Sequence, residues 1–391
     1  MDSRKSTAFF LLFFFFHGFF ADSVPFAARL THSMASSPPS SAAVKAGYWP
    51  AFGSAVSPPS DAALSLLTHV YYAFVQVDPA TACVALTAND SLALPLFAAA
   101  AHGHVSPVKA ILSVGGASAI ASANFARIAA NASARSAFAA SAVAVAGEYG
   151  LDGVDIDWEY PQSPQEMSDY VALFSELRRE AGAAGRCLLL TAAVHYSATA
   201  PGKTVEAYPV SYPAAEMAAE LDWVNVMAYD LHGNWDATAT GAHSGLFDAQ
   251  SDLSASYGLA TWLSAGMPAE KLVMGVPLYG RTYNLTDGEE HGIGAPARGV
   301  GPGDAGVLTL SEVVEFNGKN RATVVHDEAK VATYSFAGET WISYDDSWSA
   351  TRKAEYARGI GLRGYFLWAI GFDEDRIISR AGTKSGSSIY S

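Results

Sequence analysis

Hydrophobic residues along the chain gather in short blocks, and these blocks are flanked by Gly, Pro or Asp residues. Eight of these blocks are apolar along nearly their whole length, and helix-compatible stretches separate most of them. Strands that are apolar on both sides belong to parallel sheets covered by helices on both faces. The eight predicted strands are residues 46–49, 69–74, 110–114, 154–160, 188–194, 223–229, 272–278 and 364–368.

Eight strand–helix units over about 330 residues fit a closed (β/α)8 barrel, or TIM barrel, with insertions. We therefore predict an α/β fold with one large domain over residues 44–380. One crossover helix can be placed closely, because Ser163 suits an N-cap while Pro164 and Glu166 suit the first turn, where serine and glutamate satisfy free N–H groups reciprocally. Its buried face is predicted from apolar residues at helical spacing, namely Tyr170, Leu173, Phe174 and Leu177.

The connection between the seventh and eighth predicted strands, residues 279–363, is far longer than one crossover helix needs. A helix is predicted near residues 310–316, and alternating or β-branched segments predict antiparallel strands at 323–325, 331–336 and 340–344. Together they predict an α+β insertion over about residues 285–345. Because insertions between a barrel strand and its helix emerge on the face that carries the chemistry, this one is expected to wall a substrate groove.

The N-terminus has the pattern of a secretory signal peptide. Arg4 and Lys5 precede an apolar run over residues 8–16, which is shorter than the roughly 20 residues that span a bilayer. We predict a signal peptide over residues 1–28, with its cleavage point open between Ala21 and later alanines. A secreted protein without a membrane anchor is expected, with a vacuolar destination as the alternative. The other end segments are a Ser/Pro-rich lead-in and a flexible polar tail, residues 29–43 and 381–391.

Composition narrows the classes of partner. The chain has 24 Lys plus Arg against 38 Asp plus Glu, a formal net charge of −14, so its overall field repels nucleic acid. Cys83 and Cys187 can form at most one disulfide and cannot build a cysteine-based zinc site, and two separate thiols are the favoured interpretation. Three Asn-x-Ser/Thr triplets would accept glycans in an exported chain, at Asn89, Asn131 and Asn284.

The fourth predicted strand carries the densest group of acids in the sequence. Side chains alternate along a strand, so Asp155, Asp157 and Glu159 share one face, opposite the apolar Val154, Ile156 and Trp158. Three acids pointing into a barrel cannot all be ionised, because like charges repel strongly in a low dielectric. Such a cluster keeps one carboxyl group protonated near neutral pH, as a general acid requires.

Two other interpretations of these acids are weaker. A solvated acidic turn or a Ca²⁺ cage would need a flexible loop, whereas these acids lie on a β-branched strand flanked by Trp158 and Tyr160. We therefore predict no metal and no cofactor. The histidines do not change this, because they stand apart from cysteines and from clustered acids and are expected to be ordinary surface or core residues, namely His102, His104, His195 and His232.

The acidic segment resembles the D-x-x-D-x-D-x-E signature of glycoside hydrolase family 18, the chitinase family, and reads Asp152, Asp155, Asp157, Glu159. The resemblance covers nearly the whole chain after the leader, and the sequence is most similar to the plant class V chitinases. It includes the Ser-Val-Gly-Gly end of the third strand, the Met-Ala-Tyr-Asp of the sixth and the tryptophan of the eighth, at residues 113–116, 227–230 and 368.

The resemblance implies a mechanism in which the substrate supplies the nucleophile. Glu159 would protonate the glycosidic oxygen, and the acetamido oxygen of the sugar would attack, giving an oxazolinium intermediate and retention of configuration. Asp157 would orient the acetamido N–H, and Asp155 would share a proton with Asp157. Tyr229 would donate to the acetamido oxygen, and Asp230 would bind sugar hydroxyls. Asp152 completes the motif as a structural residue.

Further residues are predicted to bind substrate. Trp368 resembles the family's tryptophan beneath the reacting sugar, with Tyr48 and Phe74 flanking it at the ends of the first two strands. Arg281 is expected either to contact sugar or to pair with an acid. The loop at residues 231–235 departs from the Gly-Pro-rich form of the class V proteins, which leaves the substrate preference open. Two remaining candidates lie at the ends of the third and sixth strands, Gly115 and Met227.

Three functions are weighed on these residues. The first is a secreted, endo-acting, retaining chitinase, acting as a monomer on chitin or chitooligosaccharides. The second is a lectin or inhibitor on the same barrel, which the presence of Glu159 disfavours because such relatives usually lose the acid. The third is a hydrolase of lipo-chitooligosaccharides or of N-glycan cores, which only the shape of the loops would distinguish.

Overall fold

The computed structural model describes residues 43–51, 58–201 and 209–373. The predicted signal peptide, nearly all of the lead-in and the polar tail lie outside the described residues. By its contacts the chain divides into units 1–37 and 38–391, and every described residue belongs to the second. Within the described part, no helix is long and apolar enough to cross a membrane.

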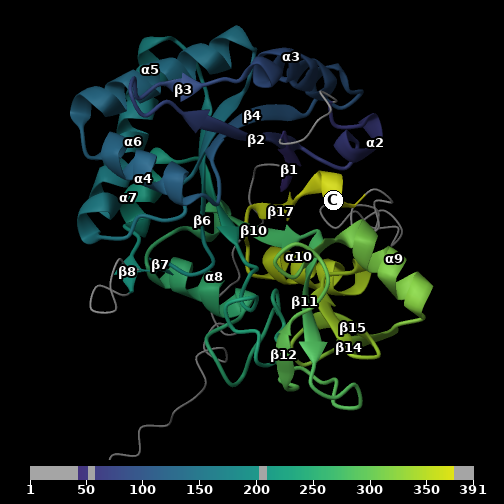
Figure 1. Cartoon of the computed structure of the whole chain (residues 1–391). Coiled ribbons are helices and arrows are strands. Elements are labelled where there is room, and N and C mark those ends of the chain that lie inside the picture. The colour runs from purple at the N-terminus through teal and green to yellow at the C-terminus, as the bar shows by residue number, and fades with distance from the viewer. Residues whose placement is uncertain (1–42, 52–57, 202–208, 374–391) are drawn as a thin grey trace, which may run out of the picture. The chain divides into compact units, whose positions relative to one another are not determined.

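Eight parallel strands form a closed barrel (Figure 1). They pair in the order β1-β17-β10-β9-β6-β5-β4-β2, and a parallel pairing of β1 with β2 closes the ring. All eight predicted strands are confirmed, within a few residues at their ends. They are β1 (Val44–Pro50), β2 (His69–Val77), β4 (Lys109–Gly115), β5 (Gly153–Asp157), β6 (Leu189–His195), β9 (Trp223–Met227), β10 (Leu272–Pro277) and β17 (Gly364–Trp368).

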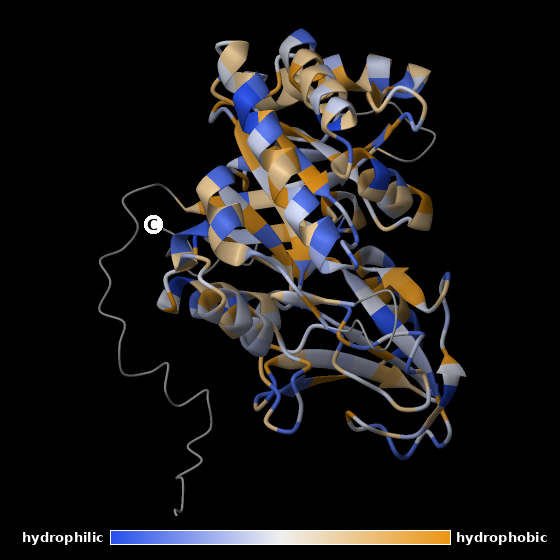
Figure 2. Ribbon diagram, turned by 90° about the vertical axis from the view of Figure 1, so that its left-hand side faces the viewer, coloured by the Kyte–Doolittle hydropathy of each residue, from blue (hydrophilic) through white to orange (hydrophobic). Residues whose placement is uncertain are grey.

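Helices cover the outside of the barrel, with α3 to α7 at the top and left of Figure 1. Apolar residues lie along the strands and the inner helix faces, and hydrophilic ones along the outer faces (Figure 2). The helices are α2 (Asp61–Leu64), α3 (Ala88–Gly103), α4 (Ala119–Ala129), α5 (Ala132–Glu148), α6 (Pro164–Ala183), α7 (Ala214–Glu220), α8 (Ala255–Ser264) and α10 (Ser347–Gly359). Shorter elements are β3 (Val84–Ala85), β7 (Thr199–Ala200), β8 (Val210–Ser211) and the 3-10 turns η3 (Ala269–Lys271) and η4 (Ile370–Phe372).

The helix predicted after the fourth strand is α6, and its cap differs from the prediction in one bond. Ser163 accepts from the Glu166 N–H at 3.2 Å, as expected. The Glu166 carboxylate, however, accepts from the N–H of Gln162 at 2.6 Å rather than from that of Ser163. The chain before the helix bends so that the amide one residue earlier meets the carboxylate, which still satisfies a free N–H.

The insertion after the seventh strand is a six-stranded antiparallel sheet with one helix, at the lower right of Figure 1. It begins earlier than predicted, at Tyr279, because β11 starts two residues after β10 ends. Its elements are β11 (Tyr279–Leu285), β12 (Ala297–Val300), β13 (Val307–Thr309), α9 (Leu310–Asn320), β14 (Thr323–Asp327), β15 (Ala332–Ala337) and β16 (Thr340–Tyr344). Three of its strands, β11, β12 and β13, were not predicted, since polar residues and glycines interrupt their patterns.

Candidate active site

The acidic strand β5 has the two faces that its alternation predicts. Its apolar side chains Val154, Ile156 and Trp158 are buried in the main hydrophobic core. On the other face Asp155 is fully buried and Asp157 is 4% exposed, inside the barrel. Glu159 lies two residues beyond the strand's last residue and is partly exposed. The acids therefore follow one another from the interior of the barrel to its carboxyl-end opening.

Asp155 is held by three hydroxyl groups from other strands. Its Oδ2 accepts from Ser113 at 2.7 Å and from Tyr48 at 3.0 Å, and its Oδ1 accepts from Thr191 at 2.6 Å. Burial raises the pKa of Asp155 to about 6, and the three hydroxyl donors limit the rise. No hydrogen bond joins Asp155 to Asp157 among the described residues, so the expected shared proton is not seen as a direct contact.

Tyr48 lies deeper than predicted. It lies beside Trp368 as expected, with ring centroids 5.6 Å apart, but it is 1% exposed and also stacks on Tyr71 inside the barrel, with ring centroids 4.4 Å apart. Its hydroxyl donates to Asp155 and accepts from Asn225 Nδ2 at 2.8 Å. The residue lines the pocket and also holds Asp155.

Asp157 is the acid with an unmet hydrogen bond. Its Oδ1 is buried and has no partner among the described residues. Burial raises the pKa of Asp157 well above its usual value, and the charges of Glu159 and Asp155 raise it further. We therefore expect Asp157 to hold a proton when the site is empty.

Glu159 has the properties of a general acid. Burial raises its pKa to about 7, a hydrogen bond from Tyr160 lowers it and the charge of Asp230 raises it. A carboxyl group with such a pKa is protonated in part at neutral pH and can both give and take a proton. Both its neighbours, Tyr160 and Asp157, line the same pocket.

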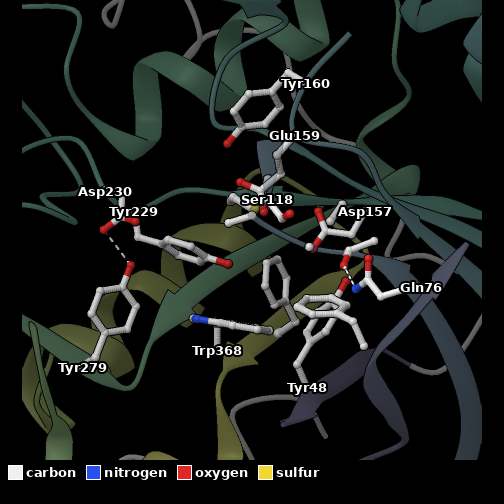
Figure 3. Close-up of a pocket in the computed structure, with 17 residues that line it drawn as sticks. Tyr48, Gln76, Ser118, Asp157, Glu159, Tyr160, Tyr229, Asp230, Tyr279 and Trp368 are labelled. Atoms are coloured by element: carbon white, nitrogen blue, oxygen red, sulfur yellow. Dashed lines mark hydrogen bonds between the residues drawn. The ribbon is translucent and has the colours of Figure 1, made fainter. Parts of the chain in front are cut away.

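The acids open into a cavity of about 370 Å³ at the carboxyl ends of the strands. Figure 3 shows Glu159 and Asp157 on one side of this space and the Trp368 indole on the other, with the Tyr229 hydroxyl between them. Trp368 stacks on Phe74 with ring centroids 5.4 Å apart and meets Tyr48 edge to face at 5.6 Å, so the three predicted aromatic residues form one wall. Met227 lines the same cavity.

A second cavity, of about 750 Å³, adjoins the first. It runs along the start of α4 and shares four residues with the first cavity, namely Ala117, Ser118, Glu159 and Tyr160. Glu159 therefore stands where the two cavities meet. A groove that continues on both sides of the acid can hold a ligand longer than one sugar.

Gly115 and its neighbour Gly116 allow the chain to approach β5 closely. They have φ values of +121° and +94°, which favour glycine. A Cβ on Gly115 would lie 2.1 Å from the Asp157 carbonyl oxygen, and one on Gly116 would lie 2.6 Å from the Phe74 ring. The Gly116 N–H also donates to the Asp157 carbonyl at 2.9 Å. Gly115 lines the pocket, and its first effect is to position the strand end.

Asp230 and Arg281 form an ion pair at the pocket edge, which settles Arg281 as the partner of an acid. Asp230 Oδ1 accepts from Arg281 Nε and Nη2, both at 2.8 Å, and from the Tyr279 hydroxyl at 2.7 Å. The same guanidinium lies over the Trp235 ring, 5.1 Å from its centroid. Trp235 is 59% exposed. Sequence reasoning missed it, although it stands in the loop that differed from the class V pattern.

Asp152, the first acid of the motif, lies at the opposite end of the barrel. It precedes β5 and binds His102 Nε2 at 2.8 Å, Lys109 Nζ at 2.7 Å and the Ala110 N–H at 2.9 Å. Burial alone would raise the pKa of Asp152, but the hydrogen bonds of Lys109, His102 and Ala110 outweigh it and the pKa is lowered. Its place supports the structural assignment.

We expect Asp152→Ala to lower the free energy of unfolding by about 1–3 kcal/mol, because it leaves the Ala110 N–H without its acceptor. Asp152→Asn keeps an oxygen that can accept from the Ala110 N–H, so its free energy of unfolding should fall by less. A lowered pKa stabilises the fold above the unfolded value of about 4, and this stabilisation fades as the pH falls. Urea unfolding at pH 7 and pH 3 measures both effects. Loss of activity per folded molecule in Asp152→Asn would contradict the assignment.

Other predicted residues are placed as follows. His102 and His232 each bind a single aspartate, Asp152 at 2.8 Å and Asp236 at 2.6 Å. Cys83 and Cys187 are separate free thiols. No cluster of His, Cys, Asp or Glu among the described residues could hold a metal ion. Of the glycosylation candidates, Asn89 and Asn131 are exposed, whereas Asn284 donates its Nδ2 to the Val300 carbonyl at 2.7 Å and is the least suited.

Comparison with known proteins finds one enzyme family and several similar proteins. The family model of the glycosyl hydrolases family 18 matches residues 44–373. A crystal structure of a class V chitinase from Nicotiana tobaccum, a Glu-to-Gln mutant in complex with NAG4, is 34% identical, with a TM-score of 0.81 over 88% of this chain and 98% of that one. Nod factor hydrolase protein 1 of Medicago truncatula is 40% identical over 84% of this chain and 86% of its own.

A third similar protein bears on the non-catalytic alternative. The chitinase-like agglutinin RobpsCRA from Robinia pseudoacacia is 33% identical, with a TM-score of 0.78 over 88% of this chain and 99% of that one. The barrel is thus shared by proteins named as hydrolases and by one named as an agglutinin. What this chain does has to be argued from its own acids.

Proposed function

Because the chain belongs to family 18 of the glycosyl hydrolases, we propose that it is a retaining chitinase that hydrolyses β-1,4 linkages between N-acetylglucosamine units. The observation that carries the proposal is Glu159, a carboxyl group with a pKa raised to about 7, at the meeting point of two cavities. The Trp368 ring faces it across the pocket (Figure 3). An aromatic wall opposite a general acid suits a pyranose ring whose glycosidic oxygen points to the acid.

The chemistry follows from the two adjacent acids. Glu159 gives its proton to the glycosidic oxygen as the bond from that oxygen to C1 breaks. The acetamido carbonyl oxygen of the same sugar bonds to C1, forming an oxazolinium ion, with its N–H held by Asp157 and its oxygen by the Tyr229 hydroxyl. Water then attacks C1 and gives a proton to Glu159 as the bond from C1 to the acetamido oxygen breaks, which restores the acetamido group and retains the configuration. Asp157 suits its role because it has an oxygen without a partner in the described structure.

Two features support cleavage within a sugar chain rather than at its end. Glu159 and Tyr160 line both cavities. A bond positioned at Glu159 therefore has room for sugars on either side. The basic and apolar start of the chain supports export from the cell.

Two alternative functions, a lectin and a hydrolase of lipo-chitooligosaccharides, have less support. A lectin would need none of the proton chemistry, yet Glu159 is present with a raised pKa. A hydrolase of lipo-chitooligosaccharides is favoured by one observation, the similarity to Nod factor hydrolase protein 1. The same acids would serve either substrate, so the difference would lie in the loops around the groove.

A product assay tests the proposed function. Chitin oligomers of four to six units should be cleaved at internal bonds, with a turnover of about 1–100 per second and with the β-anomer formed first. Chromatography on an anomer-resolving column follows the products, and the same assay is run on a lipo-chitooligosaccharide and a glycoprotein. Binding of the oligomers without any product would favour the lectin. Faster cleavage of the lipid-bearing oligomer would favour the third candidate.

A further inference from the structure

His243 is a buried titratable residue that the proposed chemistry does not use. Its side chain is fully buried in the loop between β9 and α8. Neither ring nitrogen has a hydrogen-bond partner among the described residues. Buried polar groups are nearly always paired, so an unpaired imidazole calls for a reason.

The ring lies beside the carboxylate at the pocket edge. His243 Nδ1 is 3.8 Å from Asp230 Oδ1, just beyond a hydrogen bond. That oxygen already accepts from Tyr279 and Arg281. No donor among the described residues reaches Asp230 Oδ2, and Asp230 lines the first cavity. A small movement of the carboxylate towards a ligand would change its distance to the imidazole.

The backbone of His243 also fixes the residue that follows Asp230. The Leu231 N–H donates to the His243 carbonyl at 2.9 Å. The His243 N–H donates to Ser343 Oγ of β16 at 3.1 Å. Asp230 itself has a φ of 57°, an unusual conformation for a residue other than glycine. His243 therefore lies between the insertion and the strained residue that carries the carboxylate.

The charged and titratable groups around the ring leave it neutral. They are Asp230, Tyr279 and Arg281 at the pocket edge and Asp345 at the end of β16. Burial lowers the pKa of His243, Arg281 lowers it further, and Asp230 and Asp345 oppose the shift. Both carboxylate oxygens of Asp345 already accept hydrogen bonds. Lys353 Nζ of α10 donates to Oδ1 at 2.7 Å and to Oδ2 at 2.5 Å, and Ser244 Oγ donates to Oδ2 at 2.9 Å. Asp230 is thus the acceptor that remains for a neutral imidazole.

We propose that His243 is a positioning residue for Asp230, donating from Nδ1 to Oδ1 and holding Oδ2 towards the bound sugar. The proposal rests on the proposed function, because it takes Asp230 as a sugar-binding group. It gives the insertion a role at the pocket edge, since Ser343 of β16 supports His243.

The test compares His243→Leu, which removes both nitrogens, with His243→Asn, whose amide can replace the Nδ1 donor. We expect kcat/KM on the chitin tetramer to fall about tenfold in His243→Leu and to stay within about threefold in His243→Asn. In an Asp230→Asn background, His243→Leu should change kcat/KM by less than about twofold, because its effect passes through Asp230. His69→Leu is the matched control, since His69 lies at the start of β2, at the other end of the barrel.

Three results would overturn the proposal. The first is full activity in His243→Leu, and the second is a fall in kcat/KM on adding His243→Leu to Asp230→Asn that is as large as in the wild type. The third is an equal fall in kcat/KM in His69→Leu. If the wild type turns over no substrate, the proposed function fails, and tetramer affinity measured by calorimetry on the same variants tests His243 separately. If His243→Leu does not fold, imidazole NMR of the wild type decides. A proton on Nδ1 between pH 5 and 8 supports the proposal, and one on Nε2 contradicts it.

Discussion

Glu159→Gln should lower kcat on chitin oligomers by a factor of about 1,000 or more while leaving their affinity within about threefold. The amide keeps the shape of the side chain but has no proton to give to the leaving oxygen, and general acid catalysis contributes roughly 10²–10⁴-fold. Binding depends instead on Trp368 and the other groups that line the cavity. Initial rates and calorimetric titration with the tetramer measure the two quantities.

Glu312→Gln is the matched control, because Glu312 is an exposed glutamate that caps α9 in the insertion. It should leave kcat unchanged. Turnover in Glu159→Gln at the wild-type rate would refute the assignment of the acid. A parallel loss of affinity would show that Glu159 binds the substrate in the ground state as well.

Asp157→Asn should lower kcat about 100-fold or more and at the same time make the protein more stable at alkaline pH. The loss follows because an amide cannot carry the charge that balances the developing oxazolinium ion. The gain follows from burial, which raises the pKa of Asp157 well above its unfolded value of about 4. A raised folded pKa means that the wild type loses stability as the pH rises above about 4, and the variant does not.

The melting temperature of Asp157→Asn minus that of the wild type should therefore increase from pH 4 to pH 8, by on the order of 2 °C. Asp152→Asn is the matched comparison, because the lowered pKa of Asp152 acts mainly below about pH 4, so its melting-temperature difference should stay nearly constant from pH 4 to pH 8. A constant difference across this pH range would mean that Asp157 is ionised in the folded protein. An unchanged kcat in Asp157→Asn would show that Asp157 takes no part in the reaction.

The sequence predicted the local half of the site. The alternation of Asp155, Asp157 and Glu159 with apolar residues is a property of a few consecutive positions, and the strand period of two determines the face of each. Trp368 was placed by its resemblance to the family's tryptophan, at the last residue of an apolar strand. Tyr48 lies beside Trp368 as predicted, but its bond to Asp155 was missed, because the pattern shows that it lies on a strand but not how deep in the barrel its ring reaches.

The sequence by itself determined the eight barrel strands, their order along the chain and the side on which the acids lie. Only the tertiary structure decided their partners. Tyr48 donates to an acid 107 residues away, and Arg281 pairs with Asp230 across 51 residues. His243 gave no signal in the sequence, since its burial depends on the insertion closing over its loop. Hydrophobic patterns are local, whereas the charge balance and pKa of a buried group depend on everything that folding brings around it.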